Sequence, residues 1–219
     1  MASTVGRSPD APAHITKGYE RELKQERAVQ TRERILIAAA RAFAADGYAE
    51  VTLLNIAERA GMTKGAVYFH FKNKESLAVT IAEGFYQRMV ENTETVTRLQ
   101  RPPLESLVEF LRQTAQAFRD DELIQAGSRL QLEGSSVAAP MPAPFRTFGA
   151  TVESWLAAAA KEGQLPDGVD PAALTRVLVE AYFGAQHISW VHSNWADIVE
   201  RVDEIIHVIL RVEAPRPRA

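Results

Sequence analysis

The chain has 219 residues, of which 46% are hydrophobic and 24% are charged, so it can bury a sizeable core. It contains no cysteine, which excludes disulfide bonds, thiolate metal sites and a cysteine nucleophile. No apolar run reaches the roughly 18 residues that a membrane span needs. The first 20 residues lack the apolar segment of a secretory signal. We therefore expect a cytoplasmic protein that makes no contact with a membrane.

Charge is divided unevenly along the chain, although the formal net charge is only −3. Residues 1–80 carry 12 lysines and arginines against 9 acidic residues, whereas residues 81–219 carry 13 against 19. The small net charge argues against a protein that coats nucleic acid without sequence preference. A basic segment joined to an acidic one is nevertheless typical of a nucleic-acid-binding module attached to a second domain. Charge alone does not separate this interpretation from a chance fluctuation of a few residues.

Apolar residues recur at intervals of three and four along almost the whole chain, a period that predicts α-helices. No segment alternates as a strand does over a useful length, so the expected fold class is all-α with about nine helices. We assign residues 1–24 to a flexible leader, 25–76 to a first domain, 77–213 to a second domain and 214–219 to a flexible tail. The predicted helices cover residues 26–46, 52–60, 64–70, 74–98, 104–119, 122–135, 146–162, 172–192 and 196–212.

Several of these helices carry end signals in the sequence. Gly47 and Gly61 follow the first and second predicted helices and can end them. Thr52 is suited to cap the second helix, but the capping box is incomplete because Asn55 stands where a glutamate is usual. Asp170 before a proline marks the start of the eighth helix.

Two short predicted helices joined by a tight glycine turn, residues 52–60 and 64–70, have the arrangement of a helix-turn-helix. In that motif the second helix enters the major groove of DNA. The start of this helix is nearly bare of side chains, so its free N–H groups can approach a phosphate. Donors and aromatic rings around the motif can supply contacts to the backbone and to base edges. The predicted DNA-binding residues are Arg32, Thr52, Thr63, Lys64, Gly65, Ala66, Tyr68, Phe69, His70 and Lys74.

An ordinary helical hairpin with a solvated basic rim would show the same glycine-joined pattern. The aromatic run from Tyr68 to Phe71 argues against that alternative, because one helix face can bury only about half of four consecutive rings. The remaining rings must be exposed, and exposed rings beside lysines indicate a contact surface.

Residues 61–77, GMTKGAVYFHFKNKESL, are the densest part of a wider similarity, in which residues 30–78 resemble the DNA-binding domain of the tetracycline-repressor (TetR) family. The segments QERA (25–28) and QAGSRLQ (125–131) are similar to actinobacterial γ-butyrolactone receptors, as are Pro144 and Phe145 before a long helix. The resemblance implies a homodimeric repressor that leaves a pseudo-palindromic DNA operator when a small signalling molecule binds. It also implies control of specialised-metabolite biosynthesis, such as that of antibiotics. Those receptors usually have a tryptophan where this chain has Phe148. The expected signal is therefore a lactone, a butenolide or a furan.

The effector pocket that the resemblance implies should lie between helices of the second domain and be mainly apolar with a few polar anchors. Its candidate residues are polar or aromatic side chains on otherwise apolar helix faces: Tyr86, Gln131, Phe145, Phe148, Trp155 and Trp190. Filling the core is the competing role, and it is the usual one for phenylalanine and tryptophan. Tyr86 and Gln131 would need a hydrogen-bond partner in either role.

Dimerisation is expected through the last two long helices, paired with their symmetry mates in a four-helix bundle. Small residues on the first of them, Ala181, Gly184 and Ala185, would permit close packing. The expected interface also contains His187 as a neutral, hydrogen-bonded residue, and its apolar area would come from Leu178, Val179, Phe183, Ile188, Ile205 and Ile209.

The sequence shows no sign of a catalytic or metal site. It lacks a GxSxG nucleophile elbow, an HExxH motif and a phosphate-cradling glycine loop. His187 and His192 are five residues apart and therefore do not share a helix face. We expect no enzyme activity, no metal and no cofactor. Three alternatives remain: a multidrug-type TetR regulator that senses an antibiotic or another hydrophobic compound, a helical enzyme that processes the lactone, and an interaction module without DNA contact.

Overall fold

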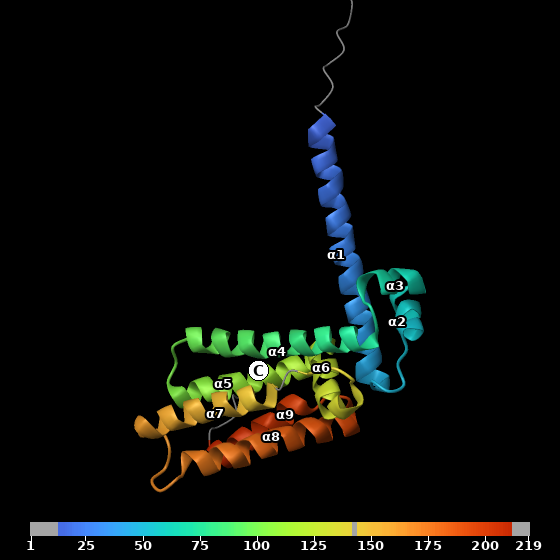
Figure 1. Ribbon diagram of the computed structural model, residues 1–219. Coiled ribbons are helices and arrows are strands. Elements are labelled where there is room, and N and C mark those ends of the chain that lie inside the picture. The colour runs from blue at the N-terminus through green and yellow to red at the C-terminus, as the bar shows by residue number, and fades with distance from the viewer. Residues whose placement is uncertain (1–12, 142–143, 212–219) are drawn as a thin grey trace, which may run out of the picture.

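The computed structural model describes residues 13–141 and 144–211, and every regular element in these ranges is a helix (Figure 1). The all-α prediction is confirmed. Residues 1–12 of the predicted leader and the whole predicted tail lie outside the described residues. The helices are α1 (Ala13–Asp46), α2 (Leu53–Ala60), α3 (Lys64–His70), α4 (Lys74–Arg98), α5 (Pro103–Asp120), α6 (Glu122–Leu132), the 3-10 turn η1 (Gly134–Ser136), α7 (Pro144–Lys161), α8 (Pro171–Ser193), α9 (Ile198–Ile205) and the π-helical turn η2 (Ile206–Leu210).

Helices α1–α3 form a module at one end of the molecule, and the first half of α1 projects beyond it (Figure 1). The core of this module includes Phe43 of α1, Ile56 of α2 and Val67 of α3, all fully buried. Ala126 and Leu130 of α6 belong to the same core. The module is therefore seated on α6 as well as joined to α4, so a movement of α6 can reach it.

Helices α4, α5, α7, α8 and α9 lie beside one another in a bundle (Figure 1). Its core is unusually aromatic and contains Phe110, Phe118, Phe148, Tyr182 and Trp195, each buried. Phe148 is central, because its ring lies 5.3 Å from that of Phe110 and 5.0 Å from that of Tyr182. Tilted and edge-on ring pairs of this kind add to the stability that burial alone provides.

Helix α1 begins at Ala13, thirteen residues before the predicted start at residue 26. The prediction depended on apolar periodicity, and the segment before residue 26 is too polar to show it. Extending a formed helix adds one hydrogen bond per residue fixed, whereas starting a new helix is costly. Exposed good helix formers such as Glu22 and Lys24 therefore continue the helix without packing on a core.

Two further details differ from the sequence prediction. The capping box of α2 is complete, because Asn55 Oδ1 accepts from the backbone N–H of Thr52 at 3.0 Å. The amide of Asn55 thus does what the expected glutamate would do. The last helix begins at Ile198, not at residue 196, because Asn194 and Trp195 have φ angles of 50° and 72° and form a left-handed turn.

In the part of the chain that the structure describes, no helix is both long and apolar enough to cross a membrane.

Candidate nucleic-acid interface and helical-domain cavities

The helices of the helix-turn-helix, α2 and α3, are fixed by caps at three points. Thr52 caps α2, and its hydroxyl donates to Asn55 Oδ1 at 2.6 Å. Gly61 ends α2 in the left-handed region with φ of 65°, which favours glycine. Thr63 caps α3, where its hydroxyl accepts from the Ala66 N–H at 3.2 Å. The predicted DNA-binding residues Thr52 and Thr63 therefore already use their hydroxyl groups within the motif.

Helix α3 divides its aromatic residues between core and surface. Phe71, at its end, is buried, whereas Phe69 is 82% exposed and Tyr68 is 47% exposed. His70 is partly buried and meets the Phe69 ring edge-on at 5.1 Å. Among the described residues, Phe69 is therefore an outward-facing ring in an otherwise well-packed module. This division is the one that the sequence argument required.

Positive and small residues surround these exposed rings. The Lys64 ammonium lies 5.6 Å from the centre of the Tyr68 ring. Gly65 is exposed, and a Cβ placed on it would find its nearest neighbour, Thr63 Oγ1, only at 3.9 Å. Ala66 is partly buried. The start of α3 is consequently open to a large partner.

Two predicted DNA-binding cations have partners inside the module. The Arg32 guanidinium lies over the Phe71 ring, 4.8 Å from its centre. Lys74 donates to the carbonyl of Tyr48 at 2.8 Å and covers the Tyr48 ring. Burial, followed by the hydrogen bond to Glu75, raises the pKa of Tyr48 to about 12. Lys74 thus has a structural role, which the sequence did not reveal because Tyr48 is 26 residues away.

The bundle contains a small aromatic cavity of about 20 Å³ between α4, α5, α7 and α8. Its polar groups are Thr114 and the hydroxyl of Tyr182, and burial raises the pKa of Tyr182. Asn92 donates to Thr114 Oγ1 at 2.8 Å, which holds this hydroxyl in place. The lining residues are Phe85, Met89, Thr114, Phe118, Phe148, Tyr182 and Phe183.

A second cavity of about 90 Å³ lies between α6 and α8 and is more polar. Inside it, the Gln186 amide donates to the Ser128 hydroxyl at 2.7 Å. Phe183 lines both this α6–α8 cavity and the aromatic cavity. The lining residues are Ser128, Arg129, Leu132, Phe183, Gln186, His187, Trp190 and Trp195.

The structure brings only some of the predicted effector-binding residues to these cavities. Phe148 lines the aromatic cavity and Trp190 lines the α6–α8 cavity. Trp155 is partly buried and packs against Phe110 with 5.2 Å between ring centres. Within the described residues, the amide nitrogen of Gln131 is buried without a hydrogen-bond partner.

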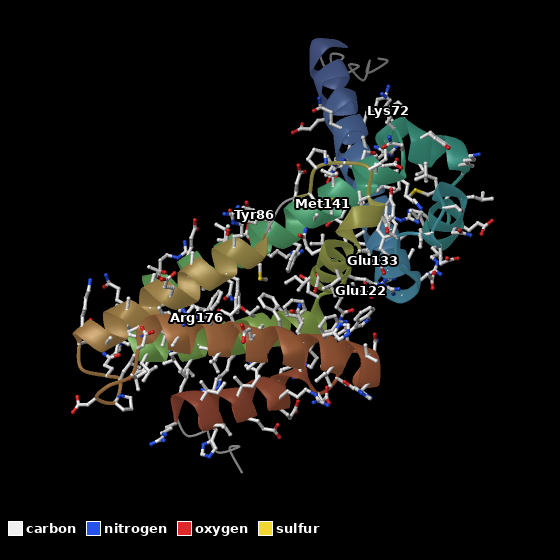
Figure 2. The ribbon with its side chains drawn as sticks, turned by 60° about the horizontal axis from the view of Figure 1, so that its bottom comes forward. Lys72, Tyr86, Glu122, Glu133, Met141 and Arg176 are labelled. Carbon is white, nitrogen blue, oxygen red and sulfur yellow. The ribbon has the colours of Figure 1, made fainter. Side chains whose placement is uncertain are left out.

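Two other predicted residues lie differently. Tyr86 is partly buried on α4 (Figure 2) and lines neither of these two cavities. Phe145 belongs to α7, but its side chain lies outside the described part of the structure. Sequence reasoning missed Phe183 as a cavity residue, having assigned it to the dimer face, and missed Trp195, which looked like part of a loop. No sequence signal marked Trp195 as a wall of the α6–α8 cavity.

An exposed apolar groove of about 410 Å³ runs along α8 and α9. Ile188 and Val208 are 44% and 73% exposed there. The predicted assignment of Leu178 to this surface is wrong, because Leu178 is fully buried in the bundle core. Helix α8 is apolar on more than one side, so periodicity could not tell its inner face from its outer one. The groove residues are Ala181, Gly184, Ala185, Ile188, Arg201, Glu204, Ile205, Val208 and Ile209.

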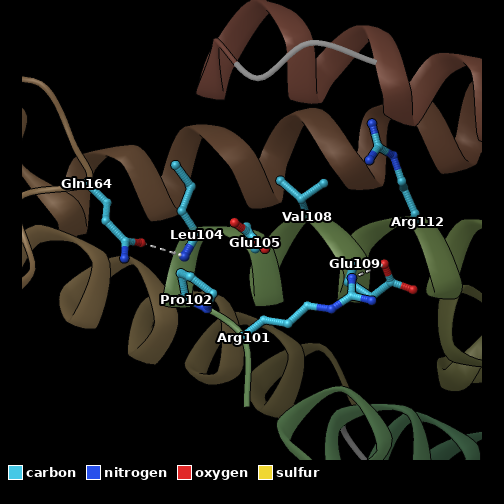
Figure 3. Close-up of a pocket in the computed structure, with 8 residues that line it drawn as sticks. All are labelled: Arg101, Pro102, Leu104, Glu105, Val108, Glu109, Arg112 and Gln164. Carbon is cyan, nitrogen blue, oxygen red and sulfur yellow. Dashed lines mark hydrogen bonds and ion pairs between the residues drawn. The ribbon is translucent and has the colours of Figure 1, made fainter. Parts of the chain in front are cut away.

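A further open groove of about 530 Å³ lies where α4 turns into α5 (Figure 3). In its wall, Arg101 pairs with Glu109 at 3.0 Å, and Gln164 accepts from the Leu104 N–H at 2.9 Å. Arg112 pairs through Nε with Asp203 at 2.6 Å, but its Nη2 is buried without a hydrogen-bond partner among the described residues. This groove contains none of the predicted site residues. Among the described residues, no group of three His, Asp or Glu side chains could hold a metal ion.

Comparison with known proteins agrees with this architecture. A family model described as bacterial regulatory proteins, tetR family, matches residues 35–81, and a tetracyclin repressor-like C-terminal domain model matches residues 101–215. The A-factor receptor protein of Streptomyces griseus is 36% identical over 195 residues. That alignment covers 85% of this chain and 65% of the relative, so the chain spans just under two thirds of the relative's length.

Solved structures give the same picture. One, described as the molecular basis for control of antibiotic production by bacterial hormones, has 45% identity and a TM-score of 0.73, and covers 84% of this chain and 97% of its own. Another, described as an ArpA-like γ-butyrolactone receptor, has 30% identity and a TM-score of 0.72, with coverage of 87% and 91%. The chain belongs to the TetR family of bacterial regulatory proteins.

Proposed function

We propose that this protein is a dimeric transcriptional repressor, which binds a pseudo-palindromic operator through α3 and is released by a small effector. The observation that carries the proposal is the outward face of α3, where Tyr68 and Phe69 are exposed beside Lys64. Apolar rings on a surface indicate a binding partner, and thymine methyl groups and sugar edges suit such rings. Because the partner is DNA, we place the protein in the cytoplasm and assign it no catalytic role.

Dimerisation would follow from the groove along α8 and α9. Ile188 and Val208 are exposed there, and an exposed apolar patch of this kind indicates an interface. Ala181 and Gly184 would let the helices of a second copy approach closely. A two-fold axis would then present two α3 helices to two half-sites, about 34 Å or one helical turn apart. The operator should accordingly be a pseudo-palindrome.

The effector would bind within the bundle. A cavity of about 20 Å³ is smaller than the roughly 30 Å³ that one water molecule occupies in the liquid, whereas sites for small molecules usually have roughly 300–1,000 Å³. Binding must therefore move aromatic side chains such as Phe148 or Phe183, which would couple effector binding to a change of shape. Gln131 lines neither cavity, so we propose that its unpartnered amide nitrogen donates to an effector oxygen after such a movement.

The class of effector is proposed from the relatives. Names that mention an A-factor receptor, a γ-butyrolactone receptor and antibiotic production support a lactone, butenolide or furan signal and control of specialised metabolism. Phe148 replaces a tryptophan that such receptors usually have, so the ring system of the signal can differ. Sensing of an antibiotic or another hydrophobic compound is the second candidate, which the apolar lining of the cavity also suits.

The DNA-binding proposal can be tested by selecting an operator from random duplexes and from the DNA upstream of the gene. In a gel shift, we expect Tyr68→Ala and Lys64→Ala to lose operator binding and to remain dimeric. Arg176→Ala is the control, because Arg176 is exposed on α8, far from α3 (Figure 2). Normal operator binding by both α3 variants would refute the assignment of α3 as the recognition helix.

The effector site can be tested with a panel of γ-butyrolactones, butenolides and furan carboxylates. For a compound that releases the wild-type protein, Gln131→Ala and Tyr86→Phe should keep operator affinity but need at least about tenfold more compound, the loss expected for one hydrogen bond to a ligand. Gln87→Ala is the control, since Gln87 is exposed on the same helix as Tyr86. Release of both variants at the wild-type concentration would remove Gln131 and Tyr86 from the site. Consumption of the compound by the purified protein would instead support an enzyme.

A further inference from the structure

One arginine on α6 holds the end of the first helix of the DNA-binding module. Arg129 Nη1 donates to the carbonyls of Ala44 and Ala45 at 2.8 Å and 2.9 Å, in the last turn of α1. Its Nε pairs with Glu133 at 2.8 Å. The other carboxylate oxygen of Glu133 accepts from the Tyr48 N–H at 2.7 Å. We name Arg129 and Glu133 the α6 clamp, because together they satisfy backbone groups that the end of α1 leaves unpaired.

The clamp fits tightly against the chain that follows α1. Gly47 has a φ of 86°, and a Cβ placed on it would lie 2.6 Å from Arg129 Nη2 and 2.9 Å from Glu133 Oε1. A side chain at position 47 would have to push the ends of Arg129 and Glu133 aside, and the positive φ would strain it. The position of the Arg129 guanidinium and the position of the end of α1 are therefore interdependent.

The same guanidinium is also a wall of the α6–α8 cavity. It lies over the Trp190 ring, 5.0 Å from the ring centre, and its side chain is only 17% exposed. Of the described residues around this cavity, Arg129 is therefore the one that also hydrogen-bonds to α1. Arg41 on α1 pairs with Glu122 on α6 as well, but both side chains are largely exposed and neither lines the aromatic cavity or the α6–α8 cavity.

We propose that Arg129 transmits occupancy of the α6–α8 cavity to the DNA-binding module. The inference rests on the proposed function and adds to it a binding site and the residue that reports it. A group entering the cavity must displace the guanidinium from Trp190 or hydrogen-bond to it. Either event weakens its bonds to Ala44 and Ala45, so the end of α1 loses its anchor on α6. The arrangement of α3 on DNA then changes, and operator affinity falls.

The lining of the cavity defines the chemistry of that group. The second N–H of the Gln186 amide and the Ser128 hydroxyl can donate hydrogen bonds into the cavity, and the Arg129 guanidinium adds a positive charge to its wall. A carbonyl or carboxylate oxygen is the matching partner. The volume of about 90 Å³ corresponds to about three water molecules in the liquid, enough for a head group. Phe183 lines both cavities, so a shift of its ring would let an apolar tail reach the aromatic cavity.

The experiment needs no identified effector, because a larger side chain can fill the cavity. Ser128 is buried and lines it, so Ser128→Leu acts as a permanent occupant. Operator affinity is measured for the wild type, Ser128→Leu, Arg129→Gln and the double variant, on the duplex selected with the wild type. We expect each single variant to bind at least about fivefold more weakly, the lower end of usual coupling between sites. The double variant should bind no more weakly than Arg129→Gln alone.

The control and a second readout separate coupling from general damage. Arg41→Gln removes the other α1–α6 ion pair and should leave both the operator affinity and the Ser128→Leu effect within about twofold of wild type, as exposed pairs contribute little. Hydrogen exchange reads the clamp directly, because the Tyr48 N–H donates to Glu133. Its exchange should speed up in Ser128→Leu and in Arg129→Gln, but not in Arg41→Gln.

The proposal would be overturned if Ser128→Leu bound the operator with wild-type affinity. It would also be overturned if the losses of operator affinity in the two single variants multiplied in the double variant. If Ser128→Leu does not fold, Leu132→Cys replaces it. Leu132 is exposed at the cavity wall and the chain has no other cysteine. Reaction of this cysteine with benzyl methanethiosulfonate should weaken operator binding, and dithiothreitol should restore it. In a protein that also carries Arg129→Gln, the reagent should have no such effect. The same response in that protein would refute the role of Arg129. A wild-type protein that selects no DNA would refute the proposed function itself.

Discussion

At the scale of single residues, the turn between α8 and α9 shows how polar contacts hold a strained backbone. Trp195 has a φ of 72°, which is unfavourable for a bulky residue. Its ring is buried and stacks on Phe118 with 5.0 Å between centres. Asp197 accepts from the hydroxyls of Ser189 and Ser193, each at 2.6 Å. The packing of Trp195 and the hydrogen bonds to Asp197 therefore fix this turn, and Trp195 lines the α6–α8 cavity.

Asp197→Asn should lower the stability of the protein at pH 7. The Arg201 guanidinium first, and then the Ser189 and Ser193 hydroxyls, hold the pKa of Asp197 well below its usual range. A carboxylate with a depressed pKa stabilises the fold above its unfolded-state pKa and loses that contribution as the pH falls through its folded-state pKa. Urea midpoints at fixed protein concentration should therefore differ between wild type and variant at pH 7. The difference should shrink below about pH 4, and a gap that stays constant at low pH would contradict this account.

Single-residue roles were predictable from sequence only where the partner is local. The aromatic run of α3 had to divide between core and surface, and it does so with Phe71 inside and Phe69 outside. Lys74 and Arg129 differ, because their partners lie 26 and 84–85 residues away. The sequence contains no local trace of such contacts, which arise only when α4 and α6 pack against α1.

At the scale of elements, the crossing of α4 and α6 depends on a glycine. A Cβ placed on Gly127 would lie 2.3 Å from Phe85 Cβ, closer than real side chains approach. Phe85 also lines the aromatic cavity. Any residue larger than glycine at position 127 must push these two helices apart. The crossing thus joins the helix that carries the clamp to the helix that leaves the DNA-binding module.

Gly127→Ala should lower the free energy of unfolding by roughly 1–3 kcal/mol, the usual effect of overpacking. Gly149→Ala is a matched control, because Gly149 lies within α7 and a Cβ there would meet no atom within 4 Å. Alanine has the higher helix propensity, so this variant should be more stable by up to about 1 kcal/mol. Thermal or urea unfolding of both variants checks the prediction. Equal stability of the two variants would mean that α4 and α6 separate without cost.

Most elements followed from periodicity, and their ends followed from local chemistry. Asp170 caps α8 as expected, with its carboxylate accepting from the N–H groups of Ala172 and Ala173. Failures occurred where tertiary structure decides. The α9 region has a left-handed turn before the helix and a π-helical turn at its end, and the apolar stripe that begins at Ile198 continues through the π-helical turn. The sequence pattern also did not show which face of α8 is buried, because apolar residues recur with helical spacing on two of its faces.

At the scale of the whole molecule, the two ends of the protein differ in charge and in shape. The α1–α3 module comes from the basic first third of the sequence, and most of the bundle beneath it comes from the acidic remainder (Figure 1). A net charge of −3 opposes binding to arbitrary DNA. Each module presents only one short helix, α3, so useful operator affinity requires two modules on one rigid body. The apolar face of α8 and α9 is where that second copy would join.

Val208→Glu should therefore convert a dimer into a monomer. Val208 is 73% exposed in the described chain, so glutamate there leaves the fold of one copy intact. In an interface, the same carboxylate would be taken out of water without a partner, which opposes association strongly. Sedimentation should give the mass of one chain, and operator binding should be lost, because one α3 helix reaches only one half-site. Leu99→Glu is the control, since Leu99 is an exposed apolar residue outside the groove. A Val208→Glu protein that stays dimeric at micromolar concentration would move the interface away from α8 and α9.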